Sequence, residues 1–305
     1  MKHIKAAIVY KAEIPTDTTI LHNHLAEKEF QPPMPMELVS RGFVPVDETE
    51  HGCLLAVAFP GGLAFRLRID EKILPASVVN AEVAKAIESI RHNEGRKPGK
   101  KERYEIKDAV LADLAQRALV RTTASITCYY HTESGYLIIP TTSKKIADAC
   151  TSMLIRAVGS VKTETIHVSD VKHGLTTRLK QYLDDEDCGA FGLFQPCDEA
   201  ALADTMKRKI SVKMNYLPMA REGLTVALTQ GFNVTSMGFH WNGVDFRLTE
   251  EFRLRGIEHP SDPDAEDVTW ASEAAIQTKA VADIVNELVE LLSYKQDDAE
   301  QAEAA

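Results

Sequence analysis

The sequence predicts an α+β fold in which mixed antiparallel sheets carry a projecting helical hairpin. Apolar runs flank Gly61-Gly62 and Asn242-Gly243, dipeptides that accept the positive φ angles of tight hairpin turns. Between residues 75 and 117, apolar side chains recur at helical spacing on both sides of a polar linker. Strand and helix patterns do not alternate as regular βαβ units, so we expect no doubly wound parallel sheet.

The composition is that of an ordinary globular protein. The 305 residues are 44% hydrophobic and 26% charged, which is typical of a chain that buries a sizeable core. No run approaches the roughly 20 apolar residues of a membrane span, and the N-terminus lacks the apolar core of a signal peptide, so we expect a cytoplasmic protein. Five cysteines without a C-x-x-C pair argue against a disulfide framework and a zinc site.

The chain divides into three expected segments: an N-terminal α/β segment over residues 1–70, a central segment over 71–160, and a C-terminal α/β region over 161–305. In the first segment, alternation predicts strands, and a proline-rich stretch ends the only helix pattern. The expected elements are a strand over 5–11, a helix over 16–30 with Ile20, Leu21 and Leu25 inward, and hairpin strands over 53–59 and 63–69.

The central segment begins with the helical hairpin. Pro75 opens one helix, and a second helix runs from about Tyr104 to Arg117. The linker over 95–101 forms the tip, so its cations should project away from the core. Two strands follow, over 125–131 and 136–140, and then a helix to about residue 158 that the Ser143 hydroxyl can cap.

The C-terminal region contains the strongest hairpin signal, with strands over 234–241 and 244–248. Upstream, a helix is expected over 176–183, Asp198 can cap a short helix to about residue 205, and alternation predicts a strand over 206–217. A long amphipathic helix closes the chain, and we expect it to support the fold or a dimer. Its stripe comprises Ile276, Ala280, Ile284, Leu288 and Leu291.

The charge distribution indicates an anion-binding surface on an acidic chain. The formal net charge is −10, and the acids of two segments, residues 258–273 and 297–303, account for all of it. Two basic clusters stand apart from this background, one around the tip of the helical hairpin and one on the strand over 206–217. Either cluster alone is typical of a solvated face. The candidate contacts for an anionic partner are Arg96, Lys97, Lys100, Lys101, Arg117, Arg121, Lys207, Lys209 and Lys213.

Catalytic chemistry has little support in the sequence. No phosphate-binding G-x-x-x-x-G-K-[ST] or dinucleotide-binding G-x-G-x-x-G motif is present. His22-Asn23-His24 lies within one predicted helix, unlike a nuclease motif assembled from several elements. A rival interpretation is a metal-dependent exonuclease that uses Asp262, Asp264 and Glu266. A third is a protein-interaction module whose basic tip binds an acidic partner. We expect no enzyme activity, cofactor or metal.

Four blocks of residues resemble the bacterial recombination-associated RdgC family, and the similarity is strongest from about residue 70 to 161. They are Glu71-Lys72-Ile73-Leu74-Pro75, Lys107 to Leu111 with Arg117-Ala118, Gly135 to Ile139, and Lys144 to Asp148. The resemblance implies a head-to-head homodimer that closes into a ring around duplex DNA without sequence preference. It further implies a nucleoid-associated protein that limits the access of the strand-exchange recombinase to DNA, with single-stranded DNA as a further candidate ligand.

The sequence departs from the family pattern in two places. Leu119 stands where the family pattern has phenylalanine, and Phe232 stands where it has lysine. The stretch over 207–231 aligns loosely. We interpret the chain as a divergent member, with a phage or mobile element as a candidate source.

Overall fold

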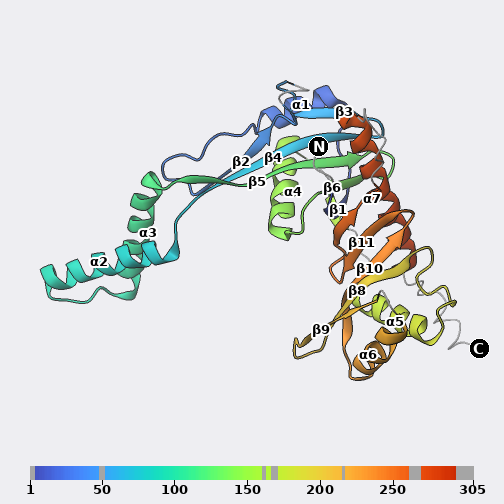
Figure 1. Cartoon of the computed structure of the whole chain (residues 1–305). Coiled ribbons are helices and arrows are strands. Elements are labelled where there is room, and N and C mark those ends of the chain that lie inside the picture. Colours follow the sequence, from blue (N-terminus) through green and yellow to red (C-terminus); the bar gives the residue numbers. More distant parts are fainter. Residues whose placement is uncertain are drawn as a thin grey trace, which may run out of the picture.

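A computed structural model describes residues 4–47, 52–159, 163–165, 171–214, 217–260 and 269–292. Figure 1 shows these residues bent into an arch, with a helical arm at one end and a smaller helix-and-strand unit at the other. The helices are α1 (Thr18–Ala26), α2 (Ala76–Glu94), α3 (Lys100–Arg117), α4 (Lys144–Val158), α5 (Val171–Asp184), α6 (Leu217–Thr229) and α7 (Trp270–Leu292). The strands are β1 (Ala6–Ala12), β2 (Val39–Val44), β3 (Ala56–Phe59), β4 (Gly62–Lys72), β5 (Val120–His131), β6 (Tyr136–Ile139), β7 (Thr163–Thr165), β8 (Gln195–Ala203), β9 (Lys209–Lys213), β10 (Asn233–Trp241), β11 (Val244–Thr249) and β12 (Leu254–Glu258).

The described strands form one antiparallel sheet in the order β2-β4-β5-β6-β1-β12-β11-β10-β8-β9, with β3 beside β4 and β7 beside β1. Strand β1 joins the two halves of this sheet, because Ile8 pairs with Ile139 of β6 while Ala6 pairs with Arg255 of β12. Residues from all three expected segments therefore share a single sheet. The α+β class with antiparallel pairing is confirmed.

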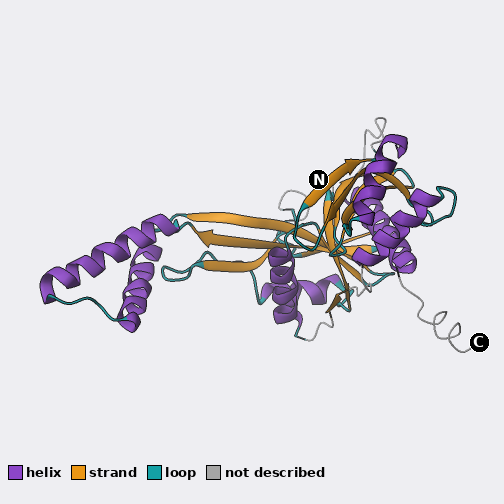
Figure 2. Ribbon diagram, turned by 90° about the horizontal axis from the view of Figure 1, so that it is seen from below, coloured by secondary structure: helices purple, strands orange, loops and turns teal. Residues whose placement is uncertain are grey.

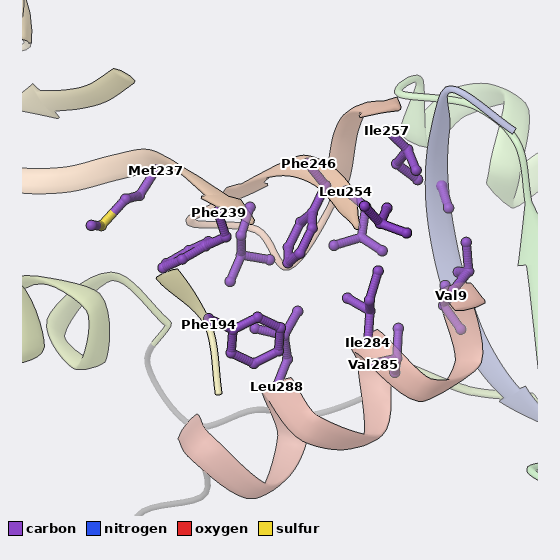
Figure 3. Packing of buried hydrophobic residues seen from close by; sticks show 14 of the residues in the cluster. Val9, Phe194, Met237, Phe239, Phe246, Leu254, Ile257, Ile284, Val285 and Leu288 are labelled. Carbon is purple, nitrogen blue, oxygen red and sulfur yellow. The ribbon is translucent and has the colours of Figure 1, made fainter. Parts of the chain in front are cut away.

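Helix α7 covers the outer side of the sheet along both halves (Figure 1). Its fully buried Ile284 and Leu288 pack in the same hydrophobic cluster as Phe239, Phe246 and Leu254 of β10, β11 and β12 (Figure 3). Because Leu288 is buried in the core of a single chain, the apolar stripe of the closing helix stabilises the fold. Ile276, which the sequence also placed on that stripe, is 64% exposed.

A second cluster lies on the opposite face of the N-terminal half, under α1 and α4. Leu21 and Leu25 of α1 and Leu154 of α4 pack there with Phe43 of β2. Ile20 is half exposed and does not point inward as expected. Since both faces of this part of the sheet are covered, the first four residues of β4 and all four residues of β6 are buried.

The two predicted tight hairpins are confirmed. Gly61 adopts φ +86° between β3 and β4, and a Cβ on Gly62 would lie 2.4 Å from the Tyr130 carbonyl oxygen. Only glycine fits both positions. Asn242 and Gly243 both adopt positive φ between β10 and β11, as a type I′ turn requires.

The helical hairpin projects from the body on β4 and β5, whose pairing runs from Gly62–His131 to Lys72–Val120 (Figures 1 and 2). Helices α2 and α3 contact each other, and Val79 and Ala115 are the only buried residues on them. The arm thus has almost no core of its own. Helix α3 begins at Lys100, earlier than predicted, so the tip linker is shorter than expected.

Several expectations in the C-terminal region are wrong. The helix expected from Asp198 is strand β8, because pairing with β9 and β10 on its two sides overrides the helix propensity of its alanines. The strand expected over 206–217 is the shorter β9, and α6 begins at Leu217. Strands β7 and β12 and helix α6 of this region were not predicted, and neither was β2 in the N-terminal segment. At α4, the Ser143 side chain makes no capping hydrogen bond.

Within the described residues, no helix combines the length and the apolar character needed to cross a membrane.

Candidate nucleic-acid interface

The tip of the arm is organised around Arg96. Its guanidinium forms two hydrogen bonds to Glu102, at 2.6 and 2.7 Å, and one to Glu94 at 2.7 Å. Glu102 also accepts a hydrogen bond from the Gly99 backbone N–H at the start of α3, which is the half of a capping box that a glycine N-cap allows. The hydrogen bonds from Arg96 lower the pKa of Glu102. Arg96 therefore joins the end of α2 to the start of α3.

Three lysines around this joint remain exposed to solvent. Lys97 and Lys100 form no ion pair with any described residue, and the Lys101 ammonium lies 4.0 Å from Glu105 with its side chain 94% exposed. Lys100 and Lys101 occupy the first turn of α3, where the helix dipole disfavours positive charge. An anion bound at the tip would relieve that repulsion.

The two arginines at the base of the arm differ in their surroundings. Arg117 forms an ion pair with Asp113, one turn earlier in α3. Arg121 is exposed on β5 and lies opposite Glu71 of β4, whose carboxylate is 3.3 Å from the Lys145 ammonium. The cations in this region are thus interleaved with acids, so the exposed positive charge of the arm concentrates at its tip.

The second predicted cluster lies at the other end of the arch. Lys209 and Lys213 are exposed on β9, while Ile210 and Val212 of the same strand pack on the core. This alternation places both lysines on one face of the strand, as the sequence predicted. That face is turned away from the hydrophobic cluster that contains α7. Lys207 sits in the β8–β9 turn with φ +60°.

The same uncovered face continues across β10, β11 and β12 as an open hollow of about 1020 Å³. Lys209, Arg247 and Arg255 line it, together with carboxylates such as Asp245 and Glu258. The two arginines were not predicted from the sequence, although the alternation of Val244, Phe246 and Leu248 with polar residues places Arg247 on the other face of the strand. The hollow is mixed in charge, and Arg247 is 3.3 Å from Glu199.

Asp262, Asp264 and Glu266, the predicted residues of a metal-dependent exonuclease, lie outside the described residues. Among the residues that are described, no group of three histidine, cysteine or acidic side chains is arranged to hold a metal ion. His22 has a structural role, since its Nδ1 accepts a hydrogen bond from the Leu55 backbone N–H.

Comparison with known proteins assigns the family. A family model described as "Putative exonuclease, RdgC" matches residues 3–295. The chain belongs to the RdgC family. Recombination-associated protein RdgC of Neisseria meningitidis is 26% identical over 310 residues, which cover 97% of this chain and 99% of that protein. The protein of the same name from Pseudomonas fluorescens is 26% identical over 83% of this chain and 82% of its own length. The one from Pseudomonas paraeruginosa is 28% identical over 82% of this chain and 81% of its own length.

The two departures from the RdgC pattern have different structural settings. Leu119 is 76% exposed at the base of the arm, beside the exposed Ile73 and Val120. Phe232 is buried next to α6, and the Arg208 guanidinium lies 5.9 Å from its ring centre. A leucine keeps the first site apolar, whereas the second site has an aromatic ring in the core in place of a charge.

Proposed function

We propose that this RdgC family member is a DNA-binding protein without enzyme activity that holds duplex DNA irrespective of sequence. One observation carries the proposal: exposed lysines gather at both ends of the arch, Lys97, Lys100 and Lys101 on the arm and Lys209 and Lys213 on β9. On a chain of net charge −10, such clusters restrict anion binding to the surfaces that carry them. The relatives' name, recombination-associated protein, agrees with a DNA partner.

The binding mechanism is electrostatic. Lysines that neutralise backbone phosphates release condensed counterions, and the gain does not depend on base sequence. An acidic remainder of the surface repels DNA and so orients it toward the two clusters. A protein that binds in this way limits the access of other DNA-binding proteins, including a strand-exchange recombinase, by occupying the duplex.

The proposed assembly is a homodimer that closes around the duplex. Ile73, Leu119 and Val120 are exposed apolar residues held together at the base of the arm, where the Ile73 N–H donates to the Leu119 carbonyl. Exposed apolar surface of this kind is typical of a contact with another protein. Two arches joined at their ends enclose a space, which gives topological retention in addition to charge attraction.

The salt dependence of binding tests the proposal. If roughly six phosphates are neutralised, the logarithm of affinity should fall with the logarithm of salt concentration at a slope near −5, and unrelated duplexes should bind alike. The variant Lys97→Ala/Lys100→Ala/Lys101→Ala should bind roughly ten-fold or more weakly, with a slope shallower by up to about 3. Its charge-matched control is Lys11→Ala/Lys180→Ala/Lys279→Ala, which removes three exposed cations from other elements.

The outcomes separate the interpretations. Equal isotherms for both triple variants across a salt series would remove the tip from the interface, and no binding of any DNA at low salt would favour a protein partner. Degradation of labelled linear DNA with Mg²⁺ or Mn²⁺, abolished in Asp264→Ala, would establish the exonuclease instead.

A further inference from the structure

A third group of cations, separate from the two lysine clusters, surrounds a pocket of about 380 Å³ beside the edge strand β2. Three basic side chains from three elements line it: Lys28 after α1, Arg41 of β2 and Arg156 of α4. Glu37 contributes the one carboxylate, and Val39 and Met153 provide apolar surface. This volume lies within the roughly 300–1,000 Å³ that is usual for small-molecule sites.

The backbone that carries Lys28 and Arg41 is held in place, while the side chains of all three cations are exposed to solvent. The Phe43 N–H donates to the Lys28 carbonyl, and the Phe30 N–H donates to the Phe43 carbonyl, so the chain after α1 runs along the edge of β2. Val39, Arg41 and Phe43 alternate along β2 and share one face. Phe43 on that face is buried with Met153 of α4, which directs Arg41 toward the same helix that carries Arg156.

The three cations lack compensation. Among the described residues, none of Lys28, Arg41 and Arg156 forms an ion pair or a side-chain hydrogen bond. Glu37 is held by the loop, where its Oε2 accepts a hydrogen bond from the Met34 N–H. The pocket therefore carries a net charge of +2, and its like charges repel one another until an anion binds.

We propose that this pocket binds a phosphate-bearing ligand of nucleotide size. Two guanidinium groups and an ammonium are the donors that phosphate oxygens recognise. The apolar Val39 and Met153 give a base or sugar a surface to contact, which a site for free phosphate would not need. The same chemistry is offered by a free nucleotide and by the phosphorylated end of a DNA strand. This inference does not depend on the duplex-binding function proposed above.

Equilibrium dialysis with radiolabelled dATP tests the site. The wild-type protein should bind dATP saturably below about 1 mM, and deoxyadenosine, which lacks phosphate, should not compete. Arg41→Ala/Arg156→Ala should weaken dATP binding roughly ten-fold or more, because two charge-assisted contacts are lost. Lys180→Ala/Lys279→Ala, which removes two exposed helical cations elsewhere, should bind dATP like the wild type. Glu37→Gln should tighten binding, because a negative charge leaves while an acceptor for Met34 remains.

Two further measurements identify the source of the phosphate group and separate this pocket from the duplex-binding surface. Competition by a 5′-phosphorylated single-stranded oligonucleotide, but not by its 5′-hydroxyl twin, would assign a strand end, whereas competition only by dATP and pyrophosphate would assign a free nucleotide. Duplex affinity of Arg41→Ala/Arg156→Ala should equal that of Lys180→Ala/Lys279→Ala. Absence of saturable dATP binding, unchanged binding in Arg41→Ala/Arg156→Ala, or a selective loss of duplex affinity in that variant would overturn the proposal.

Discussion

The Arg96 guanidinium donates two hydrogen bonds, of 2.6 and 2.7 Å, to the Glu102 carboxylate across the linker that joins α2 to α3. Because the helices bury little else, this ion pair is the main side-chain link at the tip among the described residues. Glu102 also accepts the hydrogen bond from the Gly99 backbone N–H at the start of α3. The shape of the tip, and hence the placement of its lysines, depends on one exposed pair.

Glu102→Gln should therefore loosen the tip. Hydrogen exchange of residues 95–103 should accelerate, since the substitution removes the charge that orients Arg96. DNA affinity at low salt should rise, because a guanidinium is released and a negative charge is lost. Glu105→Gln is the control, since it makes the same change in charge beside Lys101 but leaves the Arg96 pair intact. Equal exchange in the two variants would refute the role given to Arg96.

Asp70, at the base of the arm, should contribute to stability in a pH-dependent way. It is 3% exposed and accepts two hydrogen bonds from Arg68, which lower its pKa below the ordinary 3.8. Asp70→Asn should cost about 1–3 kcal/mol of unfolding free energy at pH 7, measured by urea denaturation. Asp113→Asn, in an exposed pair with Arg117, should cost less than about 0.5 kcal/mol.

The pH dependence follows from the sign of the Asp70 shift. A carboxylate whose pKa is lowered by folding stabilises the native state above its unfolded pKa of about 4, and this contribution disappears as the pH falls through the folded-state pKa. The difference in unfolding free energy between the wild type and Asp70→Asn should thus be complete at pH 7 and shrink below about pH 4. A difference that stays constant from pH 7 to pH 3 would contradict the assignment.

Leu288 should behave as a core residue of a single chain. It is fully buried against β10 and β11, so Leu288→Ala should lower the unfolding free energy by about 2–5 kcal/mol without changing the oligomeric state. Ile276→Asp, on the exposed side of the same helix, should change stability little. Urea denaturation and light scattering measure the two effects. If Leu288→Ala gave a folded monomer, α7 would instead be part of the dimer interface.

Leu119 should matter for the dimer and not for the fold. Because its side chain is 76% exposed, Leu119→Asp removes little packing within the chain, and the thermal midpoint of a diluted sample should change little. The dimer proposed above should dissociate at a protein concentration roughly ten-fold higher or more, since a charge would be buried in an apolar contact. Leu193→Asp, also exposed but in another part of the chain, is the control. A wild-type protein that light scattering shows to be monomeric at micromolar concentration would exclude the ring.

Lys209 and Lys213 provide the test at the other end of the arch. Lys209→Ala/Lys213→Ala should weaken duplex binding and make the salt slope shallower by up to about 2, because both ammonium groups project from one face of β9. Lys180→Ala/Lys279→Ala, which makes the same change in charge on α5 and α7, should leave the slope unchanged. If the two variants bind duplex DNA with the same isotherm, β9 is not part of the interface.

Local sequence patterns determined several turns, helices and strands of this protein. Positive φ angles at Gly61 and Asn242-Gly243, apolar spacing along α2, α3 and α7, and alternation in β9 each depend on residues close in the sequence, so they can be read without the fold. The arm with its basic tip and the outward lysines of β9 were predicted on this basis. So was the RdgC family, from blocks of residues that the family model later matched.

Tertiary structure alone decided the rest. Strand β8 looks helical by propensity and becomes a strand because β9 and β10 offer it backbone partners on both sides. Arg96 is a predicted DNA contact, and only folding shows that Glu94 and Glu102 surround its guanidinium. The pocket of Lys28, Arg41 and Arg156 joins residues up to 128 positions apart, and no local pattern relates them. Pairing partners and convergent charges are set by long-range packing, which one-dimensional spacing does not encode.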